Sequence, residues 1–76
     1  MVGVAKLFLQ GENLGDARVL SLQGNEIIIE LKMPVSDDRT YQIQIGGKQF
    51  NLEFTQINVT TPKHQTVYCQ AKGLIF

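Results

Sequence analysis

Four kinds of side chain in this 76-residue sequence could do chemistry: one histidine, one cysteine, a pair of aspartates and a serine. His64 lies in a Thr-Pro-Lys-His-Gln turn with no neighbouring acid or cysteine, so we expect a solvated loop residue rather than a general base or metal ligand. Cys69 alternates with Val67 and Ala71, which predicts a small buried hydrophobe rather than a nucleophile.

The remaining candidates have equally plain interpretations. Asp37 and Asp38 are adjacent in a polar loop, and no further acid lies at a chelating spacing, so we expect no metal site. Ser21 lacks the surroundings of a nucleophile elbow, so we expect it to pack or bond locally. No pair of residues has a defensible acid-base or nucleophile-base spacing, and we therefore expect neither an enzyme nor a cofactor.

The charge balance restricts the classes of partner that the protein could bind. Seven basic and seven acidic residues cancel, and no basic run is present, which argues against nucleic acid or a membrane surface as the partner. The start, Met1-Val2-Gly3, lacks the charged and then apolar pattern of a signal peptide. We expect a cytoplasmic, soluble protein whose residues 1–76 form a single small domain.

Candidate elements are all strands. No window of 11 or more residues has apolar positions at helical spacing, whereas several alternate strictly and are rich in Ile, Val, Phe and Tyr. The expected strands span residues 4–9, 17–23, 26–33, 40–45, 48–59 and 65–72.

Two glycine-containing turns predict the registers of two hairpins. A two-residue loop at Gly24-Asn25 places Leu22 opposite Ile27 and Leu20 opposite Ile29. A second loop at Gly46-Gly47 predicts the pairs Ile45 with Lys48, Ile43 with Phe50 and Tyr41 with Leu52.

Beyond that hairpin the sequence predicts an irregularity. Phe50, Leu52 and Phe54 share the core face, but after Phe54 the apolar positions change parity, as a β-bulge near Thr55 and Gln56 would require. Gly73 is expected to end the last strand. Six antiparallel strands with open edges would aggregate, so we predict a small closed six-stranded antiparallel β-barrel.

Some apolar residues fall on the face opposite this core. Val19, Ile28 and Ile75, with Ile57 or Val59, are expected there, and gathered together they would form an interaction surface. A protein partner, or weak self-association, would cover such a surface. A barrel that covers part of it with its N-terminal strand remains the alternative.

The order of features resembles a PilZ domain over residues 17–76. The segment Ala17-Arg18-Val19-Leu20-Ser21-Leu22-Gln23-Gly24 precedes an Ile-rich strand and a loop at Pro34, and the chain ends Gly73-Leu74-Ile75-Phe76. The resemblance implies a six-stranded barrel, PilZ-like, and a bacterial regulatory module.

The family's cyclic di-GMP motifs are incomplete. The RxxxR motif is absent, since the chain has only Arg18 and Arg39 as arginines. For [D/N]xSxxG, one alignment keeps Ser21 and Gly24 but has Val19 at the acidic position, and an alignment starting at Ser21 keeps none of the three. A PilZ-like domain without these residues would most simply bind a protein.

Two functions are therefore compatible with the sequence. The first is a non-catalytic regulatory or adaptor module that acts through protein-protein interaction without cyclic di-GMP. The alternative is an OB-like or SH3-like barrel that binds nucleic acid, with Tyr41, Phe50, Phe54 or Tyr68 stacking on bases.

Overall fold

The chain folds into an all-β structure without helices in the part described, as predicted. The computed structural model describes residues 3–33, 35–60 and 68–76. No helix in these ranges is long and apolar enough to cross a membrane. The six strands are β1 (Gly3–Leu9), β2 (Glu12–Gln23), β3 (Glu26–Leu31), β4 (Thr40–Ile45), β5 (Lys48–Thr60) and β6 (Tyr68–Ile75).

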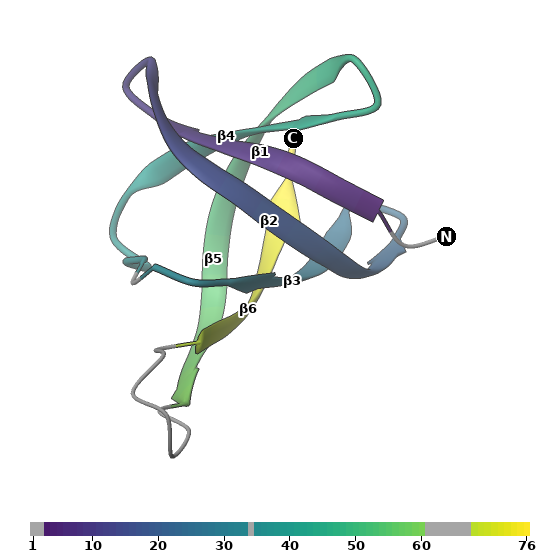
Figure 1. Ribbon diagram of the computed structural model, residues 1–76. Coiled ribbons are helices and arrows are strands. Elements are labelled where there is room, and N and C mark those ends of the chain that lie inside the picture. Colours follow the sequence, from purple (N-terminus) through teal and green to yellow (C-terminus); the bar gives the residue numbers. More distant parts are fainter. Residues whose placement is uncertain (1–2, 34, 61–67) are drawn as a thin grey trace.

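These strands form one closed antiparallel barrel, which confirms the predicted architecture (Figure 1). The order around the barrel is β1-β2-β3-β6-β5-β4, and β1 closes it by pairing with β4. Two three-stranded meanders, β1–β2–β3 and β4–β5–β6, thus pair at both of their edges. Closure of the barrel therefore pairs most of the backbone N–H and C=O groups that the edge strands of an open sheet would leave unpaired.

The glycine hairpin between β4 and β5 has the predicted register. Ile45 pairs with Lys48, Ile43 with Phe50 and Tyr41 with Leu52. Gly46 and Gly47 both have positive φ, at 57° and 86°, as a type I′ turn requires. Ile43, Leu52 and Phe54 are buried as predicted, whereas Phe50 is only half-buried; it precedes Leu52, the first β5 residue that pairs with β6.

A bulge in β2 makes the register of the other hairpin differ from the predicted one. Leu22 does pair with Ile27, but Val19, not Leu20, lies opposite Ile29 because the pairing shifts between Val19 and Ser21. Leu20 is the extra residue, so the inward-facing positions change from odd to even along β2. The bulge predicted near Thr55 is present, between Phe54 and Gln56.

Strand ends also differ from the prediction. β2 begins at Glu12 rather than Ala17, because Gln10 and Gly11 alone make the turn, with φ values of 53° and 83°. At the other end, β6 runs through Gly73 to Ile75 instead of stopping at Gly73. The predicted Thr61–His64 turn, the predicted strand start at 65–67 and Pro34 lie outside the described residues.

The core fills the barrel with aliphatic side chains and two aromatic rings. Tyr41 and Phe54 pack edge to face, with ring centroids 5.1 Å apart. The buried set is Ala5, Leu7, Ala17, Val19, Ile27, Ile29, Leu31, Tyr41, Ile43, Leu52, Phe54, Cys69, Ala71 and Ile75. No buried polar or charged residue occurs among those described, so packing rather than a polar network holds the barrel together.

Candidate binding site

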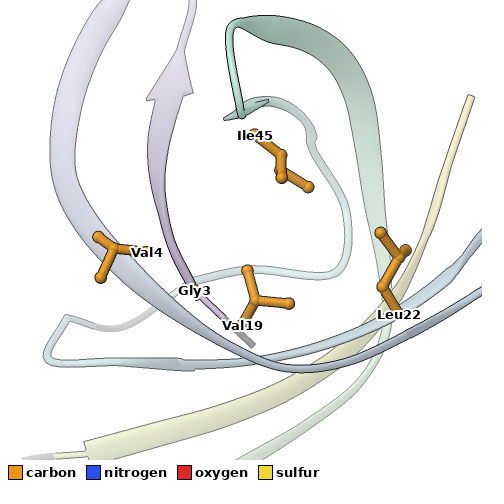
Figure 2. Close-up of a pocket in the computed structure, with 5 residues that line it drawn as sticks. All are labelled: Gly3, Val4, Val19, Leu22 and Ile45. Atoms are coloured by element: carbon orange, nitrogen blue, oxygen red, sulfur yellow. The ribbon is translucent and has the colours of Figure 1, made fainter. Parts of the chain in front are cut away.

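An apolar hollow of about 240 Å³ opens at one end of the barrel. Its lining comes from the start of β1, from β2 and from the end of β4: Gly3, Val4, Val19, Leu22 and Ile45. In Figure 2 the side chains of Val19, Leu22 and Ile45 point into the space between these strands, whereas that of Val4 lies to one side. Every lining side chain is aliphatic.

Incomplete closure of the barrel produces this hollow. β1 pairs with β4 only at Lys6 with Gln44, Leu7 with Ile43 and Phe8 with Gln42. The first residues of β1, Gly3–Ala5, therefore have no β4 partner among the described residues, and Ile45 stands beyond the last pair. Gly3 has no side chain to fill the gap, so space remains between the two strands.

The β2 bulge supplies the floor of the hollow. Because the inward-facing positions change at Leu20, both Val19 and Leu22 face the interior, each opposite a fully buried isoleucine of β3. Val19 is 3% exposed and Leu22 is 42% exposed, since Leu22 lies at the mouth. The hollow is thus an extension of the core that the described residues leave partly uncovered.

This lining determines what the hollow can do. The described residues that line it contribute neither a titratable nor a hydrogen-bonding side chain, so they supply no group for acid-base, nucleophilic or metal chemistry. It can remove apolar surface from water, and a Leu or Phe side chain gains about 1.5–3 kcal/mol when fully buried. The hollow therefore suits one aliphatic or aromatic side chain of a bound molecule.

A second hollow, of about 220 Å³, lies on the outer face of β3, β6 and β5. Its lining is largely polar and includes Gln56, Asn58, Gln70 and Lys72 around Ile28. Lys72 Nζ lies 3.5 Å from Glu26 Oε2, and each of these side chains is nearly half exposed to solvent, so this ion pair contributes little to stability.

The interaction surface predicted from Val19, Ile28 and Ile75 is not formed. Val19 is in the core because the bulge at Leu20 turns it inward. Ile75 is 8% exposed because β6 continues its alternation through Gly73. Only Ile28 lies on the outer face, half-buried between Ser21 and Lys72 of the neighbouring strands.

The described residues with reactive or ligating side chains lie on separate elements: Cys69 on β6, Ser21 on β2, and Asp37 and Asp38 in the loop before β4. Cys69 is fully buried, as predicted, and burial raises the pKa of its thiol. Ser21 is half-buried opposite Ile28, and His64 lies outside the described residues. Within residues 3–33, 35–60 and 68–76, no three His, Cys, Asp or Glu side chains gather in a way that could hold a metal ion.

The aspartates belong to a local loop structure. Asp37 and Asp38 are exposed, and the Ser36 hydroxyl donates a hydrogen bond to the Asp38 carboxylate. This hydrogen bond, together with a smaller effect of Arg39, holds the pKa of Asp38 below its usual value. The same loop is tied to the core, because the Ser36 N–H donates to the Tyr41 hydroxyl at 3.0 Å.

The aromatic residues expected to stack on bases are not available as a set. Tyr41 and Phe54 are buried in the core, where they contact one another, and Phe50 is half-buried. Tyr68 begins β6, but its side chain lies outside what is described. Tyr41 and Phe54 are therefore not exposed for the base stacking that the nucleic-acid alternative requires.

The sequence pattern predicts that Leu22 and Ile45 face the core, but it does not indicate that they lie at an unfilled end of the barrel. For Val4 it predicts only a strand. Comparison with known proteins adds no further assignment, because no protein-family model, curated protein or solved structure matches the chain.

Proposed function

We propose that the protein is a non-catalytic interaction module, of regulatory or adaptor type, which binds another protein through the hollow at the barrel end. The observation that carries this proposal is the lining itself: Val19, Leu22 and Ile45 face one opening without a polar side chain among them. An anchor residue of the partner, Leu, Ile, Met or Phe, would enter the opening.

The strand beside the hollow supports an extended partner. Gly3–Ala5 of β1 pairs with β2 on one side and has no described strand on the other. A peptide that lies along this edge can hydrogen-bond to the backbone while its anchor side chain fills the hollow. Val4, which is 68% exposed, adds an apolar contact at the rim.

Cyclic di-GMP does not enter this proposal. Arg18 lies on β2 and Arg39 in the loop before β4, so the two guanidinium groups are on separate elements. We expect no binding of cyclic di-GMP at micromolar concentration, and calorimetry that gives a dissociation constant of about 1 μM or below would contradict this. A PilZ-like ancestry remains a proposal that rests on the sequence pattern.

Selection of peptides tests the proposed function. Random linear peptides displayed on phage should converge on sequences with an apolar anchor when selected against the wild-type chain. These peptides should lose affinity for the Leu22→Lys variant, because a lysine at the mouth places a charge where the anchor must enter.

Leu74→Lys is the matched control. Leu74 is 40% exposed, close to the value for Leu22, but it does not line the hollow. Peptides that bind wild type and Leu74→Lys equally, and Leu22→Lys at least about tenfold more weakly (about 1.4 kcal/mol), support the proposal. Selection without convergence, or equal binding to all three folded chains, would overturn it.

A further inference from the structure

The far half of β5 has a strand partner on only one side. β4 pairs with Lys48–Glu53 of β5, and β6 pairs with it from Leu52 to Thr60. No described residue makes a backbone hydrogen bond to the other edge of residues 55–60. In Figure 1 this part of β5 continues away from β4, and its only described strand partner is β6, which itself pairs with β3 from Cys69 to Leu74. We call residues 55–60 of β5 the arm.

The composition of this edge is unusual for a solvent-facing strand. Residues 55–60 read Thr-Gln-Ile-Asn-Val-Thr, with no charged residue and no proline. Soluble proteins commonly protect exposed edges with lysine, proline or a covering element. The arm has neither of the two residue types, and its β-branched residues favour an extended strand. Such an edge is open to pairing with another strand.

Apolar side chains mark one face of the arm. Ile57 lies opposite Ala71 and Val59 opposite Cys69, so both face the same side as the core. Val59 is nevertheless 60% exposed, because β4 pairs with β5 only as far as Glu53 and no described strand lies beside Val59 on that edge. Gln56 and Asn58 occupy the opposite face, where they pair with Lys72 and Gln70.

We propose that the occupant of this edge is a second copy of the chain, paired antiparallel about a two-fold axis through Asn58. In that register Ile57 lies opposite the second copy's Val59, so the apolar side chains of the two copies meet on one face, and Gln56 and Asn58 occupy the other face. A two-fold axis through Ile57 would instead place Val59 opposite Thr55, which leaves Val59 without an apolar partner.

Charge favours a second copy as well. An isologous pair brings the same segment of both copies together, so any charge on the edge would face a like charge nearby. Residues 55–60 carry none, and the whole chain has a net charge of zero. The edge is therefore self-complementary in its apolar positions, and no like charges on it oppose the pairing of two copies.

The dimer is expected to be weak, because six residues of strand edge make a small interface. Sedimentation equilibrium from about 10 μM to about 1 mM, the range of weak contacts, should show an average mass that rises with concentration. The Val59→Lys variant brings two like charges onto the paired edges. In this variant the mass should not rise with concentration, or the association constant should be at least about tenfold smaller.

Val4→Lys is the control. Val4 is exposed to a similar degree as Val59 but lies at the hollow on the other end of the barrel, so this variant should associate as wild type does. Isotope-filtered NOEs between Ile57 methyls of one copy and Val59 methyls of the other should identify the register. A strict monomer at about 1 mM, or association lost in Val4→Lys and kept in Val59→Lys, would overturn the proposal.

Discussion

Gly73 approaches the backbone of Glu53 so closely that no side chain fits between them. A Cβ atom at position 73 would lie 2.6 Å from the Glu53 carbonyl oxygen and 2.9 Å from Leu52 Cδ1. The contact falls where β5 bulges after Phe54, the residue that pairs with Gly73. Glycine here allows two strands to pack closely within the barrel, and does not end a strand.

Gly73→Ala should therefore destabilise the fold. The added methyl group meets backbone that cannot move independently of the barrel, so we expect a loss of about 1–3 kcal/mol in the free energy of unfolding. Urea denaturation measures it. Gly3→Ala is the control, because a Cβ there meets nothing within 4 Å. Equal stability of the two variants would show that β6 can shift away from Glu53.

Removal of the Tyr41 hydroxyl should loosen the loop before β4. In Tyr41→Phe the ring still packs against Phe54, but the Ser36 N–H loses its acceptor. We expect a cost of about 1 kcal/mol, measured by chemical denaturation, together with faster amide exchange at Ser36. An unchanged denaturation midpoint would mean that water replaces the hydroxyl without loss.

Ser36→Ala should raise the pKa of Asp38 toward its ordinary value of 3.8, since the hydrogen bond from the serine hydroxyl is the largest cause of the lowered pKa. NMR titration of the Asp38 carboxyl carbon measures this, and Arg39→Gln should have a smaller effect. A lowered pKa in the folded state gives stability that is present above pH 3.8 and is lost as the pH falls through the lower value. No change in Ser36→Ala would refute the assignment.

The Cys69 thiol should react only when the protein opens. It is fully buried, and burial raises its pKa above the usual 9.0, so the native state presents little thiolate. Modification by an aromatic disulfide reagent should be slow in buffer and fast in urea. A native rate equal to that of a free thiol would place Cys69 at the surface. Any contribution of this shift to stability is present below pH 9.0 and is lost as the pH rises through the raised value.

Sequence alternation predicted the barrel because most strands obey it strictly. The Gly46-Gly47 register followed from turn geometry alone, and the bulge near Thr55 followed from a visible change of parity. The bulge at Leu20 gave no such signal. Val19, Leu20 and Leu22 are all apolar, so either choice of inward-facing residues produces an apolar core, and only the three-dimensional pairing distinguishes them.

The hollow could not be predicted for a different reason. Its residues come from three strands, and the space between them depends on how far the β1 and β4 strands run together before they diverge. The alternation of apolar and polar residues identifies Ile45 as inward-facing, but it does not indicate whether another side chain covers Ile45. The unpaired edge of β5 likewise depends on the unequal lengths of β4 and β5.

We expect the native state to open first at the short pairing between β1 and β4. Three residue pairs close the barrel there, against eight between β5 and β6, so local opening at this seam requires less free energy than global unfolding. Val4 and Val19 lie on one side of the seam and Ile45 on the other. A side chain seated among them would bind the closed state alone, so occupancy would slow amide exchange along Lys6–Phe8, residues that the ligand does not touch.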